Sequence, residues 1–215
     1  MEKELNVVGT RIPMLDAAEK VKGTAQFTDD LVLSGMLHGK VLRSPLPHAK
    51  ILNIDTSRAE KLPGVKGVVT GRDIPDRMYG IVPMAKDEHA LAREKVRYIG
   101  DDVAAVCAID PEIAEEALGL ITVDYEELPA VFDPLEAAKE GAPLIHAGVK
   151  NNTSFCIKKE FGDVEKALAE CDDIFEHSFY SQAVNHAPLE PHAALAQFDP
   201  LNGHLTVWSS TQIPY

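Results

Sequence analysis

The 215-residue sequence lacks the long apolar runs of membrane proteins: no stretch approaches the roughly 18 residues that a membrane-spanning helix requires. The N-terminus, MEKELNVVGTRIP, also lacks the apolar segment of a secretory signal peptide. Basic residues are scarce, with 21 Lys and Arg against 34 Asp and Glu and a net charge of −13 at pH 7. This charge argues against a nucleic-acid backbone or an anionic membrane as a partner. We expect a cytoplasmic protein.

Cysteine is also rare, and the three thiols, Cys107, Cys156 and Cys171, include no CxxC pair. Neither a zinc knuckle nor an iron–sulfur cluster can be built from them. We expect buried, reduced thiols, with Cys171 on the apolar face of a helix. P-loop, GxGxxG and GxSxG motifs are absent as well, so the sequence supports neither a phosphate cradle nor a serine esterase.

The composition, with 45% hydrophobic and 26% charged residues, is that of a globular protein. The length suits one large domain or two modest ones. Residues 1–20 show no sustained period and predict an extended arm. Two prolines and two glycines predict a surface linker over residues 132–150. We therefore place one domain at residues 21–131 and another at 151–215.

The first domain is predicted to be α+β, because a strand–helix–strand pattern occurs twice, in residues 37–69 and 102–128. In the second pattern, residues 103–109 form a continuous apolar run, which is typical of a strand buried on both faces. Asp110 and Pro111 then provide a helix N-cap and a favoured first helical residue.

The segments between these strands contain a short helix, a long loop and one histidine of interest. Asp55 or Ser57 is expected to cap the helix, and Ser57 and Glu60 have the spacing of a capping box. Residues 76–92 have no sustained period and predict a loop that is an interface or a functional cover. His48 lies in a turn between strands, where packing or hydrogen bonding is a more common role than catalysis.

The second domain is predicted to end in a β-hairpin. Before it, we expect strands at residues 155–161 and 173–183, with a helix that begins near Asp163 between them. The hairpin is indicated by two apolar runs on either side of the turn residues 199–203. Its second strand leads into Ser209–Gln212.

One cluster, His186, Glu190 and His192, resembles a set of zinc ligands in its residue types. Pro188 and Pro191 flank the glutamate, so it belongs to neither a helix nor a regular strand, and no HExxH motif is present. We therefore expect no metal ligand in this chain.

Five stretches, in this order, resemble the molybdenum-binding large (alpha) subunit of the xanthine dehydrogenase and aldehyde oxidase family. They are Lys20–Asp30, Arg43–Ile51, Val96–Val106, Leu189–Ala194 and Ser210–Gln212. The second departs from the family pattern at Leu46 and Pro47, and the third has Asp102 in place of a proline. Among family members, the pattern from Phe161–Val164 to Asn185–His186 most resembles the 4-hydroxybenzoyl-CoA reductase alpha subunit.

The resemblance implies an α/β hammerhead domain at 21–131 and the incomplete first part of the molybdenum-cofactor-binding domain at 151–215. In that family, the molybdenum centre oxidises an aromatic, heterocyclic or aldehyde carbon, whereas the 4-hydroxybenzoyl-CoA reductase branch reduces its substrate. The direction of electron flow is therefore open. Electrons pass to iron–sulfur and FAD partner subunits.

The resemblance also assigns one cofactor-binding residue, Gln212, to the glutamine that hydrogen-bonds the apical oxo ligand of molybdenum. A neutral amide can donate a hydrogen bond to an oxo group without adding charge. From the spacing alone, Gln212 is equally an ordinary solvated glutamine at a strand end. No catalytic residue is expected in this chain, because the family's general-base glutamate and its glycine-rich cofactor loops lie in later sequence.

The expected cofactor is a molybdenum pterin, in its cytosine dinucleotide form, which this chain contacts only in part. The expected partners are the remainder of the molybdenum subunit or a second molybdenum-binding chain, together with the iron–sulfur and FAD subunits. We expect the chain by itself to be inactive and to expose apolar surface around Leu195, Val207 and Trp208. The alternative is a non-catalytic assembly or binding module that keeps the fold without the cofactor.

Overall fold

The structure is a computed structural model that describes residues 7–80 and 86–212. The beginning of the expected arm (1–6), part of the expected loop (81–85) and the last residues of the expected second domain (213–215) lie outside the described residues. None of the described helices has the length and apolar character of a membrane span.

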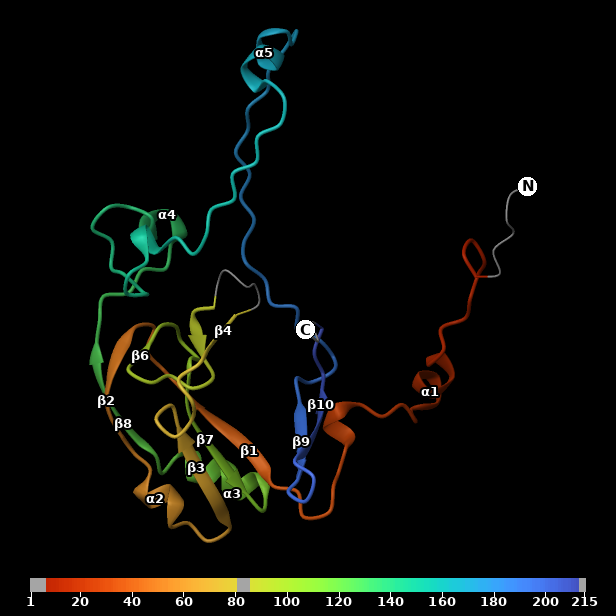
Figure 1. Cartoon of the computed structure of the whole chain (residues 1–215), viewed down its shortest axis with the longest axis vertical. Helices are drawn as coiled ribbons and strands as arrows, with labels where there is room; N and C mark the ends of the chain where they lie inside the picture. The colour runs from red at the N-terminus through yellow and green to blue at the C-terminus, as the bar shows by residue number, and fades with distance from the viewer. Residues whose placement is uncertain (1–6, 81–85, 213–215) are drawn as a thin grey trace. The chain divides into compact units, whose positions relative to one another are not determined.

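The chain divides into two compact units (Figure 1). One unit is continuous and comprises Gly35–Ile174. The other combines Met1–Ser34 with Phe175–Tyr215, so it brings together the two ends of the sequence.

The continuous unit contains two three-stranded antiparallel sheets. In the first, the strand order is β1 (His38–Arg43), β7 (Asp102–Ala108), β3 (Val65–Thr70). In the second, the order is β6 (Lys95–Val96), β2 (Ala49–Asp55), β8 (Thr122–Glu127). The two strands of each predicted strand–helix–strand pattern therefore lie in different sheets. The helix between them connects one sheet to the other, and it does not link two parallel strands of the same sheet.

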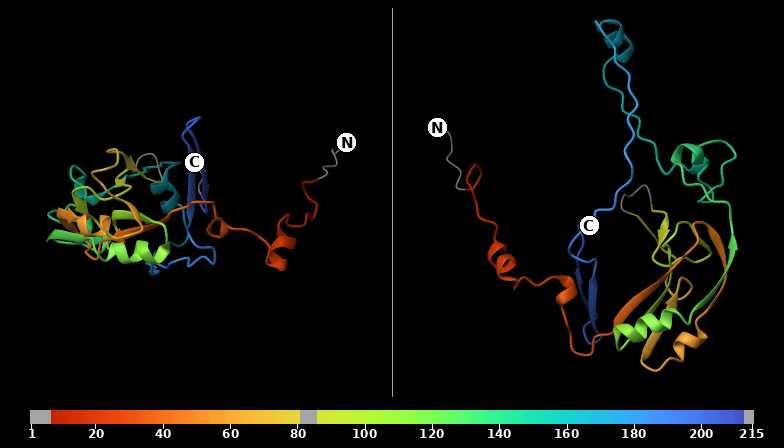
Figure 2. Two further views of the ribbon diagram at one scale, coloured as in Figure 1. Left: turned by 90° about the horizontal axis from the view of Figure 1, so that it is seen from below. Right: turned by 180° about the vertical axis from the view of Figure 1, so that it is seen from behind.

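Strand β7 is the centre of the first sheet, as its apolar run predicts. Val103, Ala104, Val106 and Ala108 are buried, and both edges of the strand are paired. Its small side chains leave room for a helix, α3 (Pro111–Leu118), which packs against β1 and β7 (Figures 1 and 2).

Helix α3 begins where the sequence indicates. The Asp110 carboxylate accepts hydrogen bonds from the backbone N–H groups of Glu112 (2.9 Å) and Ile113 (3.4 Å), which satisfies donors that the first helical turn leaves unpaired. Ala114 and Ala117 are fully buried on the face toward the sheet. The predicted N-cap and first-turn proline are thus confirmed.

The second sheet packs around Ala49, Ile51 and Val96. His48, which precedes β2, joins this strand to the segment that follows β8. His48 is only 4% exposed, and its Nδ1 lies 2.6 Å from the carbonyl oxygen of Pro129. Its own carbonyl accepts from the N–H of Leu128 at 2.9 Å. The structural role predicted for His48 is therefore confirmed.

Several local predictions are corrected. A helix, α1 (Ala17–Lys22), begins within the arm that was expected to be extended; with six residues it is too short to produce a detectable period. Helix α2 (Ser57–Glu60) has Thr56 at its N-cap position, so neither Asp55 nor Ser57 is its N-cap residue. The Asp55 carboxylate accepts a hydrogen bond from the Ser57 N–H at 3.0 Å, just before the helix. The expected loop contains a small ladder, β4 (Met78–Tyr79) with β5 (Glu88–His89).

The predicted linker contains a short helix, α4 (Pro134–Ala137), and a 3₁₀ turn, η2 (Lys150–Asn152). Helix α5 (Val164–Ala169) forms as predicted, with Asp163 as its cap. Residues 155–161 and 173–183 do not form the predicted strands. A strand needs a hydrogen-bonded neighbour, and neither segment has one within the described part of the chain.

The predicted burial of the cysteines is wrong for two of them. Cys107 is half-buried in β7, whereas Cys156 and Cys171 are exposed, and all three thiols are free. Helix α5 has no buried residue, so its apolar side packs against no core within the described residues. Cys171 lies two residues beyond the end of this helix. The Cys171 thiol instead donates to the carbonyl oxygen of Ala167 at 3.2 Å.

The discontinuous unit contains the predicted hairpin. Its strands are β9 (Ala194–Asp199) and β10 (His204–Ser209), paired antiparallel from Ala194 with Ser209 to Asp199 with His204. A 3₁₀ turn from the N-terminal part of the unit, η1 (Thr28–Asp30), packs against β9.

Candidate functional site

The hairpin turn is fixed by side chains that bond to its own backbone. The Asp199 carboxylate accepts from the Leu201 N–H at 2.9 Å, and the Asn202 side-chain oxygen accepts from the His204 N–H at 2.7 Å. Gly203 has a positive φ of 71°, a conformation that glycine adopts without steric cost. These contacts set the register of the hairpin and hence the position of its open end.

At the open end, Ser210 joins two of the five stretches that resemble the family, Leu189–Ala194 and Ser210–Gln212. Its hydroxyl oxygen accepts from the Ala193 N–H at 2.8 Å, and the same hydroxyl is within bonding distance of the carbonyl oxygens of Pro191 (3.1 Å) and Ala193 (3.2 Å). The Ser210 N–H also donates to the Ala193 carbonyl at 3.1 Å. The sequence analysis did not assign this role to Ser210, because the partners lie 17 and 19 residues away.

Gln212 follows two residues later and is exposed. No hydrogen bond joins its amide to another residue within 7–80 and 86–212. The Ser210 contacts therefore hold the backbone before Gln212 beside Pro191–Ala193, while the Gln212 amide keeps both its donors and its acceptor available.

Ser210→Ala is expected to destabilise this connection by about 1–2 kcal/mol, because the Ala193 N–H loses its side-chain acceptor. Amide hydrogen exchange at Ala193 should accelerate by about tenfold as a result. Ser209→Ala is the matched control, since Ser209 is exposed at the end of β10. Equal exchange rates in the two variants would contradict a connecting role for Ser210.

The two faces of the hairpin differ in character. One face carries Phe198, Leu205 and Val207, which are 62%, 57% and 55% exposed. Leu195 and Trp208 pair on the opposite face and are half-buried. The predicted apolar exposure is thus confirmed for Val207 and wrong for Leu195 and Trp208, because alternate residues of a strand point to opposite faces.

The histidines and glutamate that suggested zinc do not converge. His186, Glu190 and His192 are exposed, and no group of three His, Cys, Asp or Glu side chains within the described residues could hold a metal ion. A cavity of about 410 Å³ lies at the turn end of the hairpin, beside Asp199 and His204. It is therefore at the opposite end of the hairpin from Gln212.

Comparison with known proteins assigns both parts of the chain. Residues 22–129 match the family "Aldehyde oxidase and xanthine dehydrogenase, a/b hammerhead domain". Residues 145–215 match "Molybdopterin cofactor-binding domain". The chain belongs to the aldehyde oxidase and xanthine dehydrogenase family, as the N-terminal portion of its molybdopterin-binding large subunit, and the predicted fold class is confirmed.

Two curated relatives show how much of such a subunit is present. The nicotinate dehydrogenase large molybdopterin subunit of Eubacterium barkeri is 38% identical over 216 residues, which are 100% of this chain and 50% of that protein. The 6-hydroxypseudooxynicotine dehydrogenase complex subunit gamma of Paenarthrobacter nicotinovorans is 33% identical over 219 residues, covering 96% of this chain and 27% of that protein. The chain thus spans half of the first relative and about a quarter of the second.

Solved structures agree with this assignment. Quinoline 2-oxidoreductase from Pseudomonas putida 86 is 34% identical, with a TM-score of 0.82, over 96% of this chain and 27% of that chain. The chain therefore has the fold of the family as well as its sequence motifs. The role of Gln212 stays a prediction.

Proposed function

We propose that this chain forms the N-terminal portion of the catalytic molybdenum subunit of a hydroxylase, and that Gln212 donates a hydrogen bond to the molybdenum cofactor. The observation that supports the proposal is the Ser210 connection, which holds the backbone two residues before Gln212 beside Pro191–Ala193, within the segment that matches a molybdopterin cofactor-binding domain. The proposed layout is an arm at 1–20, the hammerhead domain at 21–131, a linker at 132–150 and the first part of the cofactor domain at 151–215.

The residues present fit a cofactor of this kind in one respect. Gln212 is exposed and has an amide without a partner in the described part of the chain, so its NH₂ group is available to donate to an oxo ligand. When bound, the cofactor supplies two-electron redox chemistry that no side chain of this chain provides. This chain orients the Gln212 donor through Ser210. We propose that the cytosine dinucleotide form is used and that later sequence holds its phosphates.

The proposed substrate is an aromatic nitrogen heterocycle that is hydroxylated on an electron-poor carbon. Support comes from the names of the relatives, which include a nicotinate dehydrogenase and a quinoline 2-oxidoreductase. A reductase like 4-hydroxybenzoyl-CoA reductase is a second candidate, favoured by the pattern from Phe161–Val164 to Asn185–His186. In either case we propose iron–sulfur and FAD partner subunits and a cytoplasmic location.

A further partner is proposed to complete the cofactor domain: the remainder of the molybdenum subunit, in the same polypeptide or as a second molybdenum-binding chain. Support comes from the apolar hairpin face of Phe198, Leu205 and Val207, since an isolated two-stranded sheet is only marginally stable without cover. The lengths of the relatives support both arrangements. The same matched region is 50% of the nicotinate dehydrogenase subunit but 27% of the 6-hydroxypseudooxynicotine subunit, so the former is about half as long.

Molybdenum analysis tests this proposal. Residues 1–215 purified alone are expected to contain no stoichiometric molybdenum and to self-associate through the apolar hairpin face. Co-production with the remainder of the subunit and the electron-transfer subunits is expected to give a molybdenum-containing complex that hydroxylates a heterocycle such as nicotinate. Stoichiometric molybdenum in the isolated chain would refute the division of the site, and a complex without molybdenum would support the assembly-module alternative.

A further inference from the structure

Helix α3 covers one face of the first sheet of the continuous unit (Figures 1 and 2). Ala104 and Val106 of β7 pack in one core cluster with Ala117 of α3. Leu42 of β1 and Val68 of β3 pack against the same cluster. Because successive residues of a strand point to opposite faces, the residues that alternate with these form the other face, which we call the outer face. Its residues are Gly39, Val41, Gly67, Val69, Ala105 and Cys107.

One row of the outer face is an exposed apolar stripe. Val41 of β1 and Val69 of β3 both pair with Ala105 of β7, and directly paired residues lie on the same side of a sheet. Val41 and Val69 are 36% and 40% exposed. The same alternation continues to Leu37 before β1 and Ile109 after β7, which are 43% and 53% exposed. The outer face therefore exposes apolar side chains to solvent on all three strands or directly beside them.

The neighbouring row has little relief, because two of its residues have no side chain. Gly39 and Gly67 both pair with Cys107. A β-carbon at Gly67 would lie 3.4 Å from the Cys107 sulfur, so the sulfur lies over that glycine on the outer face. A β-carbon at Gly39 would have no neighbour within 4 Å. Glycine within a strand often marks a place where another backbone approaches closely, so this row leaves space for a partner.

We propose that the outer face is a docking surface for the remainder of the molybdenum subunit. This inference rests on the proposed function, in which the chain is the N-terminal portion of that subunit. The relatives contain enough additional sequence for the role, since the matched region is 50% of the nicotinate dehydrogenase subunit and 27% of the 6-hydroxypseudooxynicotine dehydrogenase subunit. The docked segment is apolar and one helix wide: two strand spacings of about 4.8 Å span about 10 Å, which is the diameter of a helix.

The chemistry of the outer face favours a permanent partner over an exchanging one. None of its six defining residues carries a charge, although the chain has a net charge of −13. Interfaces between permanently associated chains are the more hydrophobic class and resemble a protein core cut in half, whereas transient electron-transfer contacts are small. We therefore assign the outer face to the remainder of the subunit and not to an electron-transfer subunit.

Alkylation of Cys107 with N-ethylmaleimide, followed by peptide mass spectrometry, tests the proposal. The thiol is free and half-buried, so we expect it to react in the 215-residue chain. In the complete molybdenum subunit, without its electron-transfer partners, the rate is expected to fall by about tenfold, because the docked segment must open before the thiol can react.

A charge on the outer face is expected to remove this protection. Val69→Lys should return Cys107 of the complete subunit to nearly the rate of the 215-residue chain, because docking would bury an unpaired ammonium group. Leu52→Lys is the matched control: Leu52 is a 56% exposed apolar residue on β2, in the other sheet, so this variant should keep Cys107 protected. If circular dichroism shows that Val69→Lys does not fold, Gly39→Gln takes its place, since its side chain extends into open space.

Equal Cys107 rates in the 215-residue chain and the complete subunit would overturn the proposal, as would protection that Val69→Lys leaves intact. Protection that appears only after an iron–sulfur or FAD subunit is added would assign the surface to that subunit instead. A rate in the isolated chain that falls as its concentration rises would identify a second copy as the occupant. A complete subunit that holds molybdenum while Cys107 stays reactive refutes only the docking surface, whereas a protected Cys107 without molybdenum refutes only the cofactor proposal.

Discussion

In the assembled enzyme, Gln212→Ala is expected to lower turnover about a hundredfold while the molybdenum content stays unchanged. The variant removes the donor that we propose faces the cofactor, and the loss of one preorganised donor near developing charge typically costs on the order of 3 kcal/mol. The cofactor should still bind, because this chain provides only a small part of its proposed contacts. Turnover and molybdenum content measured on the same preparations check both parts of the expectation.

Gln212→Glu is expected to be slower still, because a carboxylate repels an oxo ligand and can donate only when protonated. Gln197→Ala is the matched control: Gln197 is an exposed glutamine on β9, toward the turn end of the same hairpin. Full activity of Gln212→Ala would mean that another residue occupies the position beside the cofactor. Loss of molybdenum from Gln212→Ala would mean that the amide holds the cofactor instead of assisting the reaction.

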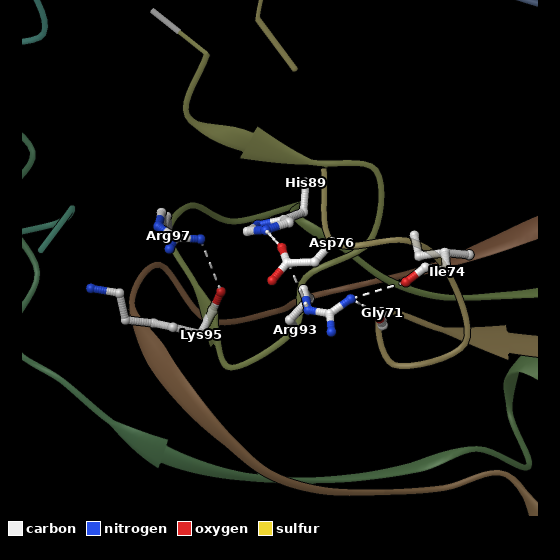
Figure 3. Close-up of polar contacts among 7 residues, drawn as sticks. All are labelled: Gly71, Ile74, Asp76, His89, Arg93, Lys95 and Arg97. Atoms are coloured by element: carbon white, nitrogen blue, oxygen red, sulfur yellow. Dashed lines mark hydrogen bonds and ion pairs between the residues drawn. The ribbon is translucent and has the colours of Figure 1, made fainter. Parts of the chain in front are cut away.

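Gly71→Ala is expected to destabilise the continuous unit by about 3 kcal/mol, with a fall in Tm of about 10 °C. A β-carbon at this position would lie 2.6 Å from the carbonyl oxygen of Ala92 and 2.9 Å from that of Leu91. Both contacts are to backbone atoms, so relief requires movement of the segment that carries Arg93. The Arg93 hydrogen bond to the Gly71 carbonyl would be strained by the same movement (Figure 3).

Gly39→Ala is the control for this change. Gly39 lies in β1 of the same unit, and a β-carbon there would have no neighbour within 4 Å. Thermal unfolding of the two variants should therefore differ by several degrees, with Gly39→Ala close to the parent chain. A Gly71→Ala protein as stable as Gly39→Ala would show that the Leu91–Ala92 backbone yields at little cost.

The parts of the fold that the sequence predicts are those specified by local chemistry. The apolar run of β7, the Asp110 cap of α3 and the turn residues of the hairpin each act within a few positions, so their patterns are readable along the chain. Helix α1 and the β4–β5 ladder are too short for a period to be detected. The assignment of β2 and β3 to different sheets depends on long-range pairing that local patterns do not contain.

The candidate site was predictable to a similar degree. The motif around Gln212 indicates a position, but the hydroxyl that joins it to Pro191–Ala193 becomes visible only in three dimensions. The exposed face of the hairpin could have been derived from strand alternation, which separates Val207 from Leu195 and Trp208.

The discontinuous unit has a consequence for the timing of folding during synthesis. Its first part ends at Ser34 and its second begins at Phe175, with the whole of Gly35–Ile174 between them. At a translation rate of roughly 5–20 residues per second, this interval lasts on the order of 10 s. The continuous unit can therefore fold on the ribosome before β9 is synthesised. During this time the N-terminal segment lacks β9, the strand against which its η1 turn packs. Residues 7–34 are therefore the segment that stays without its packing partner for the longest time during synthesis, and the segment that a nascent-chain chaperone is expected to bind.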